Sequence, residues 1–203
     1  MLIAITGGIG CGKSVVSELL RVMGFPVYDC DVNAKLLMIK DENLRQNLIN
    51  IFGTETYLSD GSLNKPLLSK SIFSSPDLLA RMNEAVHPAV SKDIYNTMNA
   101  YYMKRSDSTK IFFYESAILF ESQFNKIAVP DAVISVSAPL ELRISRTMAR
   151  DNTTREVVMS RINSQMSQEE KDSLADYVIK NDDRNSVIAQ VCQIIPYFLC
   201  QSR

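Results

Sequence analysis

The sequence is poor in the residues that most often bind transition metals. It holds a single histidine, which is too few for a Cys/His zinc site. Its four cysteines form no C-x-x-C pair. They are Cys11, Cys30, Cys192 and Cys200. This usage indicates reduced thiols, so we expect a cytoplasmic protein.

Long hydrophobic runs and an excess of charge of either sign are also missing. No run of about eighteen apolar residues occurs, so the sequence predicts no membrane span. The 22 basic and 23 acidic residues leave a net charge of −1, which gives no reason to expect nucleic acid or an anionic membrane as a partner. Met1–Thr6 runs directly into glycines without a charged n-region, and we interpret it as a strand and not as a signal peptide.

What is present indicates an α/β domain with insertions. A chain of 203 residues that is 46% hydrophobic can bury a large core. Short apolar runs alternate with helical patterns, which predicts a parallel sheet flanked by helices. The expected strands are Leu2–Thr6, Pro26–Asp29, Lys110–Glu115, Ala132–Val136 and Tyr177–Lys180. We expect residues 1–31 and 106–203 to form the core, 32–105 a helical insertion, and 141–173 a second helical insertion.

The first helix has the clearest pattern. Val16, Leu19, Leu20 and Met23 recur at i, i+3, i+4 and i+7, which predicts one buried stripe. Gly24 then provides a stop signal.

The strongest motif stands between the first strand and this helix. Gly7–Ser14 matches G-x-x-x-x-G-K-[ST] at every position. Glycines let backbone N–H groups turn inward around phosphate oxygens, Lys13 brings a positive charge to the β- and γ-phosphates, and the Ser14 hydroxyl can bind Mg²⁺. A dinucleotide fingerprint read from Gly8 fails, because Lys13 stands where its third glycine should be. The motif therefore predicts an ATP site. The residues expected to contact the nucleotide are Gly8, Ile9, Gly10, Cys11, Gly12, Lys13, Ser14 and Val15.

Two acids follow predicted strands, at the sheet edge where ligands of open α/β sheets bind. Asp31 can accept the proton of an attacking hydroxyl, as a general base does in phosphoryl transfer. It also precedes a helical pattern, so it is equally well interpreted as an N-cap. Glu115 ends an apolar strand, where an acid can hold Mg²⁺ or its waters, or can simply be solvated.

The second insertion contains five arginines within nineteen residues, 143–161, that hold no lysine. They are Arg143, Arg146, Arg150, Arg155 and Arg161, and the first three fall at i, i+3 and i+7 on one helix face. The planar guanidinium suits phosphate oxygens, so the pattern favours phosphate contact over a solvated charged face. Arginine-rich lids stabilise the transferring phosphoryl group and exclude water when they close. His87 stands in a helical pattern before Pro88, where a structural histidine is the default interpretation.

Several of these segments, in this order, resemble the dephospho-coenzyme A kinase family. Thr6–Ser14 is similar to the family's T-G-G-I-G-S-G-K-S, Asp29-Cys30-Asp31 to its D-A-D, and His87-Pro88 to its His-Pro element. Three later segments continue the order: Leu119-Phe120-Glu121, Arg146–Asp151 as R-x-x-x-R-D, and Asn163-Ser164-Gln165 followed by Ala175–Asn181. The chain departs from the family at Val15, Glu115 and Ala117, and Asn181 lacks the glycine that usually follows it.

The resemblance implies a P-loop kinase fold, with a five-stranded parallel sheet, a coenzyme A-binding insertion at 32–105 and a lid at 141–173. It implies ATP-dependent phosphorylation of the ribose 3′-hydroxyl of dephospho-CoA with Mg²⁺, the last step of coenzyme A synthesis. Asp31 inherits the role of base, and Lys13 and Arg146 that of charge stabilisers. His87, Glu115 and Arg150 are expected to contact substrate, and Ser14 the metal. We expect a monomer or small homo-oligomer. The alternatives are a kinase of the nucleoside-monophosphate type and a non-enzymatic nucleotide-binding module.

Overall fold

The computed structural model describes residues 1–104 and 110–201. The chain forms two compact units, one made of Met1–Asp29 with Met98–Arg203 and the other of Cys30–Thr97. The expected boundary at 105–106 lies outside the described residues, and the functional division of the chain stays a prediction.

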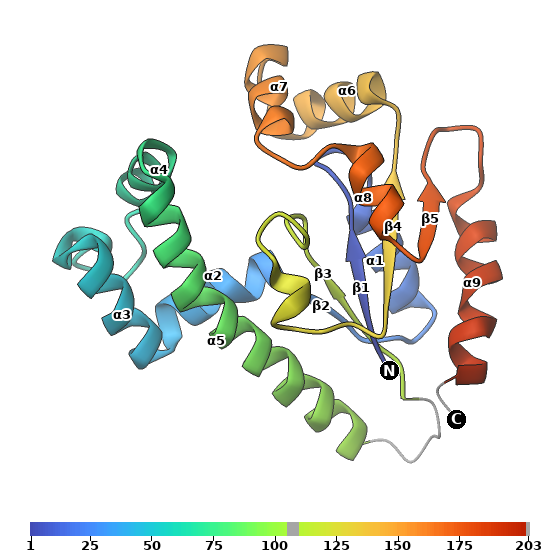
Figure 1. The fold of residues 1–203 in the computed structure, drawn as a ribbon, viewed down its shortest axis with the longest axis horizontal. Helices are drawn as coiled ribbons and strands as arrows, with labels where there is room; N and C mark the ends of the chain where they lie inside the picture. Colours follow the sequence, from blue (N-terminus) through green and yellow to red (C-terminus); the bar gives the residue numbers. More distant parts are fainter. Residues whose placement is uncertain (105–109, 202–203) are drawn as a thin grey trace. The chain divides into compact units, whose positions relative to one another are not determined.

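The first unit is built on a five-stranded parallel sheet with the strand order β2-β3-β1-β4-β5 (Figure 1). All five expected strands are present, and their ends differ from the predicted ones by two residues at most. They are β1 (Leu2–Thr6), β2 (Val27–Asp29), β3 (Phe112–Glu115), β4 (Ala132–Ser137) and β5 (Tyr177–Lys180). The central strand β1 pairs with β3 on one side and β4 on the other, so the loop after β1 emerges in the middle of the carboxyl edge.

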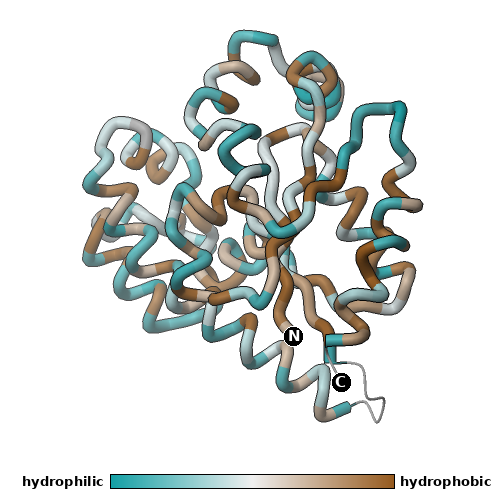
Figure 2. The backbone as a smooth tube through the Cα atoms, turned by 45° about the vertical axis from the view of Figure 1, so that its right-hand side comes forward, coloured by the Kyte–Doolittle hydropathy of each residue, from teal (hydrophilic) through white to brown (hydrophobic). Residues whose placement is uncertain are grey.

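Helices cover both faces of this sheet. Helices α1 (Lys13–Val22) and α9 (Val187–Gln201) share one apolar core with Ile134 and Val136 of β4. Ser135 lies between those two residues, so its side chain points to the other face, where its hydroxyl donates to Asp172 of α8 (Gln168–Leu174). Figure 2 shows the strands as a hydrophobic centre between more polar helices. The parallel α/β architecture predicted from the sequence is confirmed.

The end of α1 differs from the prediction in one residue. Gly24 stops the helix as expected, with φ at 90° and its N–H donating to the Arg21 carbonyl. Met23, however, is exposed, although its backbone at the C-cap is still helical, so the buried stripe ends at Leu20. Ser17 is buried instead.

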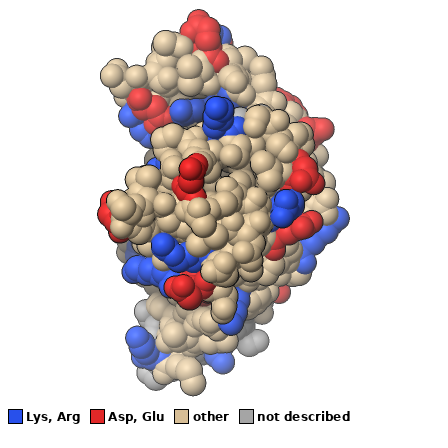
Figure 3. Space-filling model, turned by 90° about the vertical axis from the view of Figure 1, so that its left-hand side faces the viewer, with Lys and Arg blue, Asp and Glu red and all other residues tan. Residues whose placement is uncertain are grey.

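The second predicted insertion is helical, as expected. It contains α6 (Leu140–Asp151), α7 (Arg155–Asn163) and α8, and a short turn η2 (Phe124–Lys126) precedes it in the chain. Basic and acidic side chains are interspersed on the face shown in Figure 3, in keeping with the balanced composition. Among the described residues, no helix combines the length and apolarity needed to span a bilayer.

The second unit is helical, as its sequence predicted. It contains α2 (Cys30–Lys40), α3 (Glu42–Phe52), η1 (Thr54–Thr56), α4 (Lys65–Ser74) and most of α5 (Pro76–Met103). Side chains of Asp41 and Asn64 cap α3 and α4 by accepting backbone N–H groups of the first turn. The buried Tyr57 hydroxyl donates to the Met38 carbonyl at 2.6 Å and so joins the segment after η1 to α2.

His87 is buried on α5, and this burial lowers the pKa of its imidazole below 6.5. The neutral ring is therefore favoured in the folded state. Below pH 6.5 the unfolded chain binds a proton that the folded chain does not, so stability decreases as the pH falls toward the folded-state pKa.

His87→Gln should flatten this acid response, because His87 is the only histidine. Between about pH 7 and about pH 5, wild type should lose more unfolding free energy than the variant, by at most about 1.4 kcal/mol per pH unit. Urea unfolding at each pH measures the difference. Parallel profiles for the two proteins would contradict the burial effect.

Candidate active site

The loop between β1 and α1 is packed so closely that its glycines are required. Gly10 has φ at 77°, and a Cβ there would collide with the carbonyl of Arg143 and the hydroxyl of Thr147 on α6. Gly12 has φ at 94°, and a Cβ there would collide with the amide of Asn181. The glycines therefore leave the backbone N–H groups of the loop accessible, as phosphate binding requires.

Helix α1 begins directly in this loop. Gly12 is its N-cap and offers no side chain to the first N–H groups, which suits an anion at the positive end of the helix. The Lys13 ammonium lies over the loop, donating to the carbonyl of Gly7 at 3.0 Å and, at 3.5 Å, to that of Gly8. Ser14 and Val15 are exposed on the first turn. The residues present fit a bound triphosphate, because the glycines leave space at the loop that larger side chains would occupy.

Two acids end neighbouring strands beside the loop. Asp29 of β2 and Glu115 of β3 are paired in register. Glu115 is not a freely solvated strand end, because the buried Ser17 hydroxyl on α1 donates to its Oε2 at 2.7 Å. Ser17 follows Ser14 by three residues, so both hydroxyls lie on one side of α1. This donor set suits Mg²⁺, which commonly takes one or two protein oxygens, phosphate oxygens and water.

Asp31 is the second residue of α2 and lies in its first turn. Since the helix begins at Cys30, the N-cap alternative for Asp31 is not supported. Its assignment as the base stays a prediction.

Two arginines of α6 contact the loops around the cradle. Arg143 is buried, and its Nε donates to the carbonyl of Ile9 at 3.0 Å. Arg146 donates to the carbonyl of Asn181 at 3.0 Å and forms an ion pair with Asp183 at 2.6 Å. Asn181 in turn donates to the carbonyl of Cys11 at 2.9 Å. The loop after β5 is thus joined to both α6 and the phosphate loop.

The other three arginines of the second insertion have acidic partners on α6. Arg150 and Arg161 both pair with Asp151, and their hydrogen bonds hold the pKa of that carboxyl below its usual value. Arg155 pairs with Glu141 through two contacts of 2.7 Å. Arg150 would therefore have to leave Asp151 to contact a phosphate.

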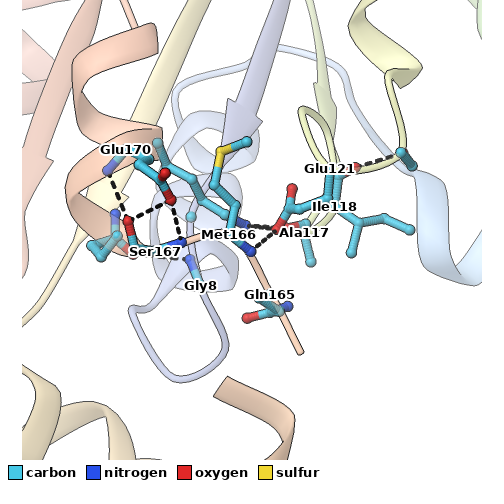
Figure 4. Close-up of polar contacts among 12 residues, drawn as sticks. Gly8, Ala117, Ile118, Glu121, Gln165, Met166, Ser167 and Glu170 are labelled. Carbon is cyan, nitrogen blue, oxygen red and sulfur yellow. Dashed lines mark hydrogen bonds and ion pairs between the residues drawn. The ribbon is translucent and has the colours of Figure 1, made fainter. Parts of the chain in front are cut away.

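Helix α8 and the turn before it contribute contacts that the sequence did not predict. The side-chain oxygens of Gln165 and Gln168 accept the N–H groups of Ile9 at 2.9 Å and Gly8 at 3.0 Å. Figure 4 shows Gln165 to Glu170 beside Gly8 and the segment from Ala117 to Glu121. The Ser167-x-x-Glu170 capping box is a sequence signal for the start of α8, but no pattern reveals which loop its glutamines bind.

Lys171 is the second residue on α8 that was missed. Its side chain is fully buried, and its Nζ forms an ion pair with Glu121 at 2.6 Å and donates to the carbonyl of Ala117 at 2.7 Å. Burial lowers the pKa of Lys171, while the hydrogen bond that Lys171 donates to Glu121 opposes that shift. A cavity of about 750 Å³ opens nearby and is lined by residues that include Pro139, Arg143, Gln165, Gln168 and Lys180.

Gly10→Ala should disable the cradle, because a Cβ would both strain the positive φ and overlap backbone atoms of α6. We expect ATP affinity to fall roughly tenfold or more, as measured by titration calorimetry. Gly24→Ala is the matched control, since Gly24 also has a positive φ but a Cβ there meets nothing within 4 Å. Equal ATP affinities for the two variants would contradict the assignment of the cradle.

Comparison with known proteins places these features in a family. Residues 1–186 match the family described as dephospho-CoA kinase. The protein called dephospho-CoA kinase in Bacteroides fragilis is 40% identical over 207 aligned residues, which cover 99% of this chain and 97% of that one. Its counterpart in Porphyromonas gingivalis is 42% identical, with 95% of this chain and 92% of that one covered.

Solved structures agree on the fold. The crystal structure of TT1252 from Thermus thermophilus has a TM-score of 0.80 and 31% identity, covering 98% of this chain and 97% of that one. Dephospho-CoA kinase from Campylobacter jejuni has a TM-score of 0.66 at 24% identity, covering 100% and 98% of the two chains. A shikimate kinase from Acinetobacter baumannii shares the fold at a TM-score of 0.54 and 13% identity, covering 98% and 93%. With its phosphate loop complete and the family matched over residues 1–186, this chain belongs to the dephospho-CoA kinase family.

Proposed function

We propose that the protein transfers the γ-phosphoryl group of ATP to the ribose 3′-hydroxyl of dephospho-CoA, giving ADP and coenzyme A, the last step of coenzyme A synthesis. The observation that carries this proposal is a complete phosphate loop, crowded by backbone carbonyls of β4 and α6 and by neighbouring side chains, in a chain of the dephospho-CoA kinase family. The nucleotide is held by Gly8–Val15, with Lys13 beside the transferring phosphate.

Mg²⁺ accompanies the nucleotide in this proposal, and the Ser14 hydroxyl is its protein ligand. When bound, such an ion neutralises charge on the β- and γ-phosphate oxygens. Glu115 accepts the hydroxyl of Ser17, three residues beyond Ser14 on α1, and would contact either the ion's waters or the acceptor.

The proton of the attacking hydroxyl passes to Asp31. The 3′-oxygen then forms a bond to the γ-phosphorus as the bond to the β–γ bridging oxygen breaks, and ADP leaves. Lys13 and Arg146 stabilise the charge on the transferring group. Arg146 has to exchange Asn181 and Asp183 for phosphate oxygens, and this exchange accompanies closure of the lid at 141–173. His87 and Arg150 are the remaining substrate contacts that we propose, within the insertion and the lid.

We propose that the protein is located in the cytoplasm. We also propose that it is a monomer or a small homo-oligomer. All four cysteines are free thiols, which supports a reducing compartment.

Acceptor-stimulated ADP release tests the reaction against its two alternatives. Dephospho-CoA should raise ADP release well above the hydrolysis seen with ATP alone, because only the correct acceptor completes the site. Stimulation by AMP or CMP instead would indicate a kinase of the nucleoside-monophosphate type. A protein that binds ATP but responds to no acceptor would be a nucleotide-binding module.

Asp31→Asn should separate binding from catalysis, because it keeps the size of the side chain but removes the proton acceptor. We expect kcat to fall by about 10²- to 10⁴-fold while ATP affinity stays within about threefold of wild type. Asp77→Asn is the matched control, since Asp77 also lies in the first turn of a helix, α5, and is exposed. Near-normal turnover by Asp31→Asn would remove Asp31 from the role of base.

A further inference from the structure

We propose that α8 is the positioning element of the phosphate site, in which Gln168 fixes the phosphate loop and Lys171 fixes the chain that leaves β3. This inference rests on the proposed function only in taking Gly7–Ser14 as the ATP site. Gln168, Lys171 and Asp172 fall at i, i+3 and i+4, so one face of a single helical turn presents all three side chains.

The amide of Gln168 is buried, and its orientation is fixed by its partners. Its Nε2 donates to the Asp172 carboxylate at 2.7 Å and to the Val136 carbonyl at 3.2 Å. Since both partners are only acceptors, the nitrogen must face them, and the oxygen is left pointing at the Gly8 N–H, 3.0 Å away. The Ser135 hydroxyl holds Asp172 at 2.6 Å. Strand β4 thus sets the orientation of the Gln168 amide, which holds the phosphate loop.

The peptide units at the start of the cradle are held from two sides. Gln165 accepts the N–H of Ile9 at 2.9 Å, and Arg143 donates to the Ile9 carbonyl at 3.0 Å. A Cβ on Gly8 would overlap the Arg143 guanidinium, so a larger residue there would displace this side chain. The loop conformation is therefore determined by side chains of the lid segment and not by the loop residues alone.

Lys171 extends the same control to the neighbouring strand. Its Nζ contacts the Ala117 carbonyl at 2.7 Å and Glu121 at 2.6 Å, and Glu121 also accepts the N–H of Met166 at 3.1 Å. Ala117 follows Glu115 by two residues, so the pair fixes the chain just beyond the acid at the end of β3. One turn of α8 therefore sets the spacing between the phosphate loop and the segment that carries Glu115.

Gln168→Met tests this role, because methionine keeps the length of the side chain but has no strong acceptor for Gly8. In the full-length protein, KM for ATP and the ATP dissociation constant without acceptor should each rise roughly tenfold. KM for dephospho-CoA should stay within about twofold, which is not expected of general destabilisation. Tyr114→Phe is the control, since it removes another buried bond to a carbonyl, that of Ala128 at 2.7 Å, away from the loop.

Exchanging the amide of Gln168 and the carboxylate of Asp172 should partly restore ATP binding. Gln168→Glu keeps an acceptor for Gly8 but faces the Asp172 carboxylate, so ATP should bind weakly. In Gln168→Glu with Asp172→Asn, the donor and acceptor of the pair are exchanged and its total charge is kept. This double variant should bind ATP about threefold or more tightly than Gln168→Glu. A double variant no better than Gln168→Glu would contradict the role of the amide in orienting the loop.

Other outcomes decide the proposal as well. Wild-type ATP affinity in Gln168→Met, or an equal loss in Tyr114→Phe, would overturn it. If Gln168→Met does not fold, as judged by circular dichroism, Asp172→Asn alone replaces it and should weaken ATP binding about threefold, and no change would overturn the proposal. If the ATP dissociation constants shift as expected but dephospho-CoA does not stimulate wild type, the acceptor assignment fails and the positioning role stands.

Discussion

The close approach of neighbouring groups to the glycines of Gly7–Ser14 is the constraint on which the site depends. Carbonyls of β4 and α6 and the side-chain amide of Asn181 lie where Cβ atoms of these glycines would otherwise be. The loop can present N–H groups to phosphate because its glycines have no Cβ. The sheet order contributes to this, since β1 ends between β3 and β4 and brings both flanking segments to the same edge.

Much of this architecture was predictable because its signals are local. The strands, the helical insertions, the phosphate loop and the stop at Gly24 each follow from a few adjacent residues. Met23 was assigned wrongly to the core, because periodicity alone does not show how far along a helix the core extends. Arg150 pairs with Asp151, its neighbour in the sequence, whereas the spacing of the arginines favoured contact with phosphate.

The contacts of α8 could not be predicted, because they join residues far apart in the chain. Gln168 meets Gly8 across 160 positions, and Lys171 meets Ala117 across 54. A buried lysine in a polar helix resembles a surface residue in sequence, and only the fold reveals its partner Glu121. Buried polar groups with several partners specify one arrangement, which is what an active site built on loops needs.

In the reaction that we propose, the phosphate loop holds the phosphoryl donor and Asp31 activates the acceptor. A crystal structure with a non-hydrolysable ATP analogue and dephospho-CoA tests this claim most directly. The γ-phosphate should lie in the Gly8–Ser14 loop, with the ribose 3′-hydroxyl at hydrogen-bond distance, about 3 Å, from the Asp31 carboxylate. A 3′-hydroxyl bound away from both groups would contradict the account.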